Sequence, residues 1–249
     1  MRPEQLKTSD VNIVAEMRNE FAVISSSEEM TLQELLDHFH IRMDPFLKML
    51  SQYQCAVAEI ETKFRVLNMS LSVNDEQNPI ESIKTRIKRP DSIISKLIKQ
   101  GNPINLDSVR KNIFDVAGVR VICSFIDDIY RLEQLLLAQE DVKLIKRKDY
   151  IETPKESGYR SLHLVIQTPI YTETGRQDMN VEVQMRTIAM DFWASLEHKL
   201  RYKKELEREI LSRLGKELEE CASESAKLDQ RMLEIRQEID MYHSEAENE

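Results

Sequence analysis

Asp115 is an acidic residue placed where it could hold a divalent metal ion. It opens the segment Asp115-Val-Ala-Gly-Val-Arg120, at the point where an apolar, β-branched run begins. A carboxylate at the edge of a strand, with Gly118 allowing a backbone to approach closely, suits a magnesium ion that carries phosphates. A simple turn-capping role for Asp115 is the alternative that this local pattern leaves open.

Glu182 could supply a second carboxylate. The segment Val181–Arg186 alternates apolar and polar residues, so Glu182, Gln184 and Arg186 should share one face of a strand. That face could be plainly solvent-exposed, or it could be the floor of a pocket in which Glu182 lies beside Asp115. Two carboxylates and a cluster of cations are the minimum for Mg²⁺-assisted transfer of a phosphorus group.

A cluster of cations lies between residues 81 and 120, which carry nine Lys/Arg against four Asp/Glu in a chain whose net charge is −9. An Arg guanidinium can stack on a purine or bind phosphate with two parallel hydrogen bonds, whereas Lys acts as a point charge. A basic segment in an acidic protein indicates local binding of a polyanion rather than general nucleic-acid binding. A solvated basic helix face is the alternative. The conspicuous polar residues here are Arg86, Lys88, Arg89, Ser92, Lys96 and Lys99.

A second polar stretch combines aromatic and basic side chains. Tyr and Arg planes suit stacking on a nucleotide base, and Lys suits phosphate. Tyr159 could instead be a half-buried packing residue, and His163 an ordinary hydrogen-bonded strand residue. The members of this stretch are Lys148, Asp149, Tyr150, Lys155, Gly158, Tyr159, Arg160 and His163.

The elements that must position these residues alternate between strand and helix signals. Apolar residues three or four apart predict a helix over Leu32–Leu71, and turn signals predict a loop over Ser72–Pro79. We expect a basic loop and a short helix near Ser92–Lys99 in residues 80–114. The strands expected after it are 119–125, 142–147, 161–168 and 181–185, and the helices are 126–138 and 187–203. This order predicts an α+β fold with a mixed sheet flanked by helices.

The two ends of the chain differ from this middle part. Residues 1–30 are polar and weakly patterned, and we expect them to be loose. The tail carries a heptad-like stripe on a charged helix, which could fold back onto the domain or pair with another subunit. Its members are Leu214, Leu218, Cys221, Ser225, Leu228, Met232, Ile235 and Ile239.

Composition excludes several classes of protein. Forty-one per cent hydrophobic and 32% charged residues are ordinary for a globular protein. No apolar run approaches the roughly 18 residues of a membrane helix, and the N-terminus lacks the apolar centre of a secretory signal. Three scattered cysteines make neither a disulfide framework nor a CxxC metal site. We therefore expect a cytoplasmic protein without membrane partners.

Five stretches in one order resemble the synthetase domain of RelA/SpoT proteins, and most of all the short, stand-alone small alarmone synthetases. Each stretch is a weak signal alone, and the likeness covers about residues 45–205. The stretches are RxKxxxS at Arg86–Ser92, DVAGVRV at Asp115–Val121, KDYIETPKESGYRSLHL at Lys148–Leu164, VEVQMRT at Val181–Thr187 and FWASLEHKLRYK at Phe192–Lys203.

The resemblance implies an activity and a set of roles on the ATP side. It implies transfer of pyrophosphate from ATP to the 3′-hydroxyl of GDP or GTP, with AMP leaving. Arg86 and Arg120 would enclose the adenine. Asp115 and Glu182 would bind Mg²⁺, and Glu182 would also be the base for the hydroxyl. The residues implied at the ATP phosphates are Lys88, Lys96 and Lys99, with Ser92 in the same motif.

On the acceptor side, the resemblance implies that Tyr159 stacks on the guanine. Asp191 stands where several relatives have Asn, so a guanine contact at this position is open. The residues implied to line the GDP/GTP site are Lys148, Lys155, His163 and Gln184.

We therefore expect a nucleotidyltransferase-like α+β fold whose synthetase domain spans residues 45–205. Residues 1–44 would be a helical or flexible extension, and residues 206–249 a helical oligomerisation tail; the resemblance implies a tetramer. A regulatory nucleotide or RNA is a further candidate partner. The rival interpretations are another Mg²⁺-dependent nucleotidyltransferase and a non-catalytic RNA-binding or scaffold protein, for which a metal site would have no use.

Overall fold

The computed structural model describes residues 32–73, 78–201 and 208–246. Its contacts divide the chain into Met1–Met49 and Leu50–Glu249, with the boundary inside helix α2 (Leu32–Leu71). The expectation for residues 1–30 lies outside the described part. The second unit contains the sheet and the C-terminal helix together.

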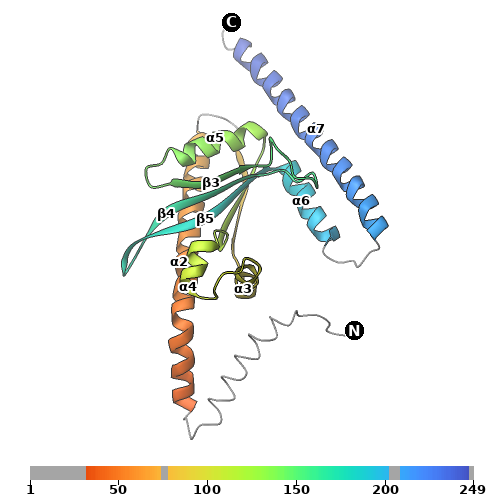
Figure 1. The fold of residues 1–249 in the computed structure, drawn as a ribbon. Coiled ribbons are helices and arrows are strands. Elements are labelled where there is room, and N and C mark those ends of the chain that lie inside the picture. Colours follow the sequence, from red (N-terminus) through yellow and green to blue (C-terminus); the bar gives the residue numbers. More distant parts are fainter. Residues whose placement is uncertain (1–31, 74–77, 202–207, 247–249) are drawn as a thin grey trace. The chain divides into compact units, whose positions relative to one another are not determined.

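A five-stranded mixed sheet forms the centre of this unit (Figure 1). Its strand order is β1-β2-β5-β4-β3, in which only β2 and β5 run parallel. The β4–β5 hairpin supplies the two longest strands. The strands are β1 (Ile80–Ile87), β2 (Ala117–Cys123), β3 (Lys143–Asp149), β4 (Leu162–Thr172) and β5 (Gly175–Thr187). The predicted α+β class and mixed sheet are confirmed.

One face of the sheet is apolar and buried. Alternate residues of β2, β4 and β5 point into it, as expected for strands with one polar and one apolar face. Helix α5 (Ile126–Leu137) packs on β2 and β5 through buried Ile129, Leu132 and Leu136. Residues 50–71 of α2 add a buried row three or four residues apart, made by Tyr53, Val57, Ile60 and Phe64.

Strand β1 corrects the prediction of a basic loop. Ile80–Ile87 pairs antiparallel with β2 along nearly its whole length, although most of its residues are partly or fully exposed. An edge strand is stabilised by its ladder on one side and needs no apolar alternation, so the usual strand signal is missing. Helix α3 (Pro90–Lys99) follows, and α4 (Leu106–Asn112), capped by the Asn105 side chain, is a helix that the pattern did not predict.

The C-terminal helices lie side by side (Figure 1). Helix α6 (Ile188–Arg201) continues from β5, and α7 (Arg208–Ala246) packs on α6 and on α5. Among the side chains of α7 that the structure describes, Ala222, Asp229 and Leu233 are buried. Leu218 packs partly on this side too, whereas much of the predicted stripe is exposed. The predicted stripe thus runs along the edge of the packed side, with Leu218 against α6 and Leu228, Met232, Ile235 and Ile239 exposed.

Candidate active site

Strand register gathers the predicted site residues on the polar face of the sheet. Residues directly opposite each other in neighbouring strands point to the same face. Gly118 of β2 is paired with Arg86 of β1 and with Glu182 of β5. Two residues further along each strand, on the same face, a polar row crosses all five strands: Lys84, Arg120, Gln184, His163 and Lys148.

A hollow of about 170 Å³ lies over this face. It contains one carboxylate, Glu182, among three cationic side chains, so it suits an anionic ligand that carries a planar group. Its lining comes from β1, β2 and β5 and consists of Lys84, Thr85, Arg86, Gly118, Val119, Arg120, Glu182 and Gln184.

Asp115 lies immediately before β2, and two lysines hold it. Lys88 and Lys96 each donate a hydrogen bond to a different carboxylate oxygen at 2.8 Å. Burial opposes ionisation, but the two hydrogen bonds and positive charges outweigh it and lower the pKa of Asp115. The carboxylate is therefore ionised at neutral pH and already has cations around it.

Hydrogen bonds also keep the Glu182 carboxylate ionised. Burial alone would raise its pKa, yet hydrogen bonds from His163 and Gln184 lower it, against the opposing negative charge of Asp115. The contact to His163 Nδ1 is 3.5 Å, and Gln184 donates its amide at 3.0 Å. Asp115 and Glu182 therefore interact electrostatically, although Asp115 precedes β2 and Glu182 belongs to β5.

These two carboxylates suit Mg²⁺ better than they suit a metal that takes all of its ligands from the protein. Within the described residues, no group of three or more His, Cys, Asp or Glu side chains could hold a metal ion. Mg²⁺ commonly takes only one or two carboxylates and completes its octahedron with water and substrate phosphates. The donor set of Asp115 and Glu182 therefore matches a metal that arrives with a nucleotide.

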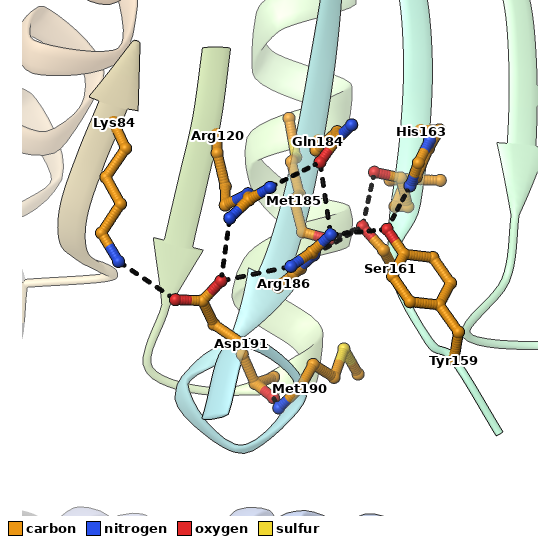
Figure 2. A network of polar contacts seen from close by, with 12 residues as sticks. Lys84, Arg120, Tyr159, Ser161, His163, Gln184, Met185, Arg186, Met190 and Asp191 are labelled. Atoms are coloured by element: carbon orange, nitrogen blue, oxygen red, sulfur yellow. Dashed lines mark hydrogen bonds and ion pairs between the residues drawn. The ribbon is translucent and has the colours of Figure 1, made fainter. Parts of the chain in front are cut away.

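A partly buried ionic network lies beside the hollow (Figure 2). The Asp191 carboxylate, in the first turn of α6, accepts hydrogen bonds from Lys84 (3.1 Å), Arg120 (3.5 Å) and Arg186 (3.2 Å). Burial and the nearby positive charge of Arg186 lower the pKa of Arg120, and the negative charge of Asp191 opposes this shift. The negative charge of Asp191 therefore offsets the repulsion between the guanidinium groups of Arg120 and Arg186.

Arg186 connects this network to the aromatic side of the site. Its side chain is only 5% exposed, and it donates to the Tyr159 hydroxyl at 2.6 Å. That hydroxyl lies 2.7 Å from His163 Nε2. An arginine can only donate, so the Tyr159 oxygen accepts the hydrogen bond from Arg186. The Tyr159 O–H can then donate to His163 Nε2. The arrangement holds the Tyr159 ring in one orientation.

The aromatic side consists of Tyr150, Tyr159 and His163, packed edge to face. Their ring centroids lie 5.3–6.0 Å apart. The ammonium of Lys155 lies 4.6 Å from the centroids of both tyrosine rings, and that of Lys148 lies 6.0 Å from Tyr150. Aromatic rings and lysines together suit a nucleotide base and its phosphates.

Most of the predicted site residues come together in the structure. Arg86, Arg120, Glu182 and Gln184 share the hollow, while Lys88 and Lys96 meet Asp115. The acceptor-side residues Lys148, Lys155, Tyr159 and His163 form the aromatic cluster. Ser92 and Lys99, at opposite ends of α3, are outside the lining of the hollow, and Lys99 is exposed.

Three residues of the site were not predicted. Arg186 shares the alternating face with Glu182, so its place was readable, but nothing in the sequence indicates its ion pair with Asp191. Tyr150 stands in the polar aromatic stretch and was noted without a role. Lys84 had no signal, because the strand that carries it was itself not predicted.

Three comparisons with known proteins agree with this geometry. Residues 85–207 match the family model described as a region found in RelA / SpoT proteins. The chain is 42% identical over 205 residues to GTP pyrophosphokinase YwaC of Bacillus subtilis, covering 82% of this chain and 97% of that protein.

Solved structures give the same result. Small alarmone synthetase 1 of B. subtilis bound to its product pppGpp superposes with a TM-score of 0.70 at 34% identity, over 78% of this chain and 98% of that one. The same enzyme bound to AMPCPP gives a TM-score of 0.65 at 32% identity, over 80% and 99%. With a relative 42% identical along nearly its entire length, this chain belongs to the RelA/SpoT family, among its small alarmone synthetases.

Proposed function

We propose that this chain synthesises (p)ppGpp by moving the β- and γ-phosphates of ATP as a unit onto the 3′-hydroxyl of GDP or GTP. The hydroxyl oxygen attacks the β-phosphorus, the bond between that phosphorus and the α–β bridging oxygen breaks, and AMP leaves. The observation that carries the proposal is the ionised pair Asp115 and Glu182 on a sheet face with cations on one side and aromatic rings on the other.

ATP would occupy the hollow over β1, β2 and β5. Arg86 and Arg120 line it from neighbouring strands, which lets their guanidinium planes enclose an adenine. Lys88 and Lys96 would turn from Asp115 toward the phosphates, and Ser92 and Lys99 of α3 would assist them. This assignment is supported by the relative bound to AMPCPP, an ATP analogue.

The acceptor nucleotide would lie on the aromatic side. Tyr159 would stack on the guanine, and Lys155 and Lys148 would meet its phosphates. His163 and Gln184, which already contact Glu182, would place the ribose hydroxyl next to that carboxylate. The relative bound to pppGpp supports a guanine nucleotide as acceptor.

Asp115 and Glu182 would hold Mg²⁺, which when bound neutralises charge on the phosphates. Glu182 would orient the 3′-hydroxyl and accept its proton. The lowered pKa of Glu182 keeps it in the accepting form, and the hydrogen bonds from His163 and Gln184 fix its direction. A general base of this kind contributes about 10²–10⁴ in rate.

The test is direct. The purified protein is incubated with Mg²⁺, ATP and either GDP or GTP, and the nucleotides are separated. We expect AMP and a 3′-pyrophosphorylated guanosine nucleotide in equal amounts, which neither rival interpretation provides. A folded wild-type protein that forms no such product with either acceptor would overturn the proposal.

We also propose that the chain is a homo-oligomer, with a tetramer as the expected state, assembled through the exposed side of α7. That side carries an apolar row three or four residues apart: Leu228, Met232, Ile235, Ile239 and Tyr242, each between 44% and 65% exposed. Single exposed apolar residues are normal, but an ordered row needs a partner surface. Met232→Glu with Ile235→Glu should lower the mass measured by light scattering, and an unchanged mass would refute this interface.

None of the helices in the described part of the chain has the length and apolar character that a membrane span requires. We place the enzyme in the cytoplasm, where ATP and guanine nucleotides are abundant.

A further inference from the structure

The loop that carries Tyr159 lies directly against α7. Gly158 adopts φ +83°, and a Cβ added to it would overlap the Cβ of Ala222 well inside van der Waals contact. Ala222 is itself 6% exposed. The loop is also tight, since Gly158 N–H donates to the Lys155 carbonyl at 2.8 Å and Lys155 N–H to the Tyr159 carbonyl at 3.2 Å. A glycine is therefore required here for backbone conformation and for space.

Tyr159 itself packs against the same part of α7. A small core is formed by Trp193 and Ala194 of α6 with Ala222 of α7, and Tyr159 and Leu218 pack against it. The ring that would stack on guanine thus has α6 and α7 on one side and the Arg186 guanidinium at its hydroxyl. Its position depends on where α7 lies.

Helix α7 is held in this position at several points along its length. The Trp193 indole N–H donates to the Leu218 carbonyl at 2.9 Å, and the Thr187 hydroxyl donates to buried Asp229 at 2.7 Å. Further along, Arg236 forms ion pairs with Asp127 and Asp128 at the start of α5. These contacts fix α7 relative to the end of β5 and to both flanking helices, so it cannot simply withdraw from the loop.

We propose that α7 is a positioning element of the acceptor site: the contact between Gly158 and Ala222 sets the place of Tyr159 and thereby the affinity for the guanine nucleotide. This inference rests on the proposed function. The ATP hollow provides an internal reference, because its lining contains no residue of the loop or of α7. A disturbance at this contact should therefore affect the acceptor and spare ATP.

The experiment compares Gly158→Ala, Ala222→Gly and the double variant. In Gly158→Ala the new methyl group pushes the loop from α7, and we expect the KM for GDP or GTP to rise about tenfold or more, as expected when a base loses its aromatic platform. The KM for ATP should change less than about twofold, because neither Gly158 nor Ala222 lines the ATP hollow. The double variant removes the overlapping Ala222 Cβ, so it should recover most of the acceptor affinity.

Gly175→Ala is the matched control. Gly175 also has positive φ, at +97°, but an added Cβ meets nothing within 4 Å there. This variant carries comparable backbone strain without the contact, and both KM values should remain at the wild-type level. Ala222→Val approaches the contact from the helix side and provides a second test if Gly158→Ala does not fold, as judged by its melting temperature.

Equal rises in both KM values, or a double variant no better than Gly158→Ala, would overturn the inference. Failure of the proposed function would look different, because the wild-type protein would then make no product. In that event the dissociation constant of GDP, measured by calorimetry on the same variants, still tests whether α7 positions the acceptor site. A GDP affinity that is unaffected by Gly158→Ala or Ala222→Val would show that α7 has no positioning role.

Discussion

Replacing Asp191 by Asn should destabilise the protein strongly, although the two side chains have nearly the same shape. The substitution removes the negative charge between Arg120 and Arg186 and leaves both guanidinium groups in place. Arg186 is only 5% exposed and Arg120 30% exposed, so solvent can compensate little for the lost charge. Arg120 already has a lowered pKa, caused first by burial and then by the charge of Arg186.

The size of the effect follows from the contacts. Removing one partner of a buried ion pair typically costs about 3–5 kcal/mol. The Asn oxygen would still accept a hydrogen bond from Arg186, which recovers about 1 kcal/mol. Lys84 is 59% exposed and loses little. We therefore expect the free energy of unfolding to fall by about 2–4 kcal/mol.

Urea denaturation at one fixed protein concentration measures this change, since an oligomer's stability depends on concentration. Asp178→Asn is the matched control, because Asp178 pairs with Arg176 on the surface, where their side chains are 46% and 60% exposed. Such a pair contributes about 0.2–1 kcal/mol. If Asp191→Asn costs no more than Asp178→Asn, Asp191 is not the counter-ion of Arg186. Adding Arg186→Met to Asp191→Asn should restore part of the lost free energy of unfolding.

Three further outcomes test the site. Glu182→Gln should abolish synthesis, with a loss of about 10²–10⁴ in kcat and an unchanged circular dichroism spectrum, and near-normal turnover would contradict its role. Tyr159→Ala should weaken the guanine nucleotide by about 1–3 kcal/mol, or tenfold to over a hundredfold, in a titration that leaves ATP affinity nearly unchanged; an equal loss for both nucleotides would move Tyr159 out of the acceptor site. Asp115→Asn should lower stability at pH 7, where Lys88 and Lys96 lose their partner. That deficit should vanish as the pH falls through the lowered folded-state pKa of Asp115, because wild-type Asp115 is then protonated too; a deficit that persists in acid would contradict the ion pairs.

Local pattern was sufficient for much of the fold and for the types of residue in the site. Strict alternation in Val181–Arg186 placed Glu182, Gln184 and Arg186 on one face, since the side-chain period of a strand is two. Helical spacing likewise revealed α2 and α5, whose apolar rows are buried. Asp115 stood out as a carboxylate next to an apolar, β-branched run, although a turn-capping role fitted the same local pattern. These features depend on neighbours in the chain, so the sequence contains them.

Tertiary structure decided what the distant residues do to one another. Strand β1 forms because its backbone pairs with β2. Its own residues therefore show no alternating strand pattern, and Lys84 was not predicted. Asp191 is a counter-ion to Arg120 and Arg186 only because the start of α6 lies at the end of β2 and β5. A helix stripe shows which residues share a side, but it does not show which side meets the domain. In α7 the packing of Ala222 and Asp229 settled that, leaving the apolar row from Leu228 to Tyr242 exposed. Such contacts depend on residues far apart in the chain, and their partners are fixed only when the chain has folded.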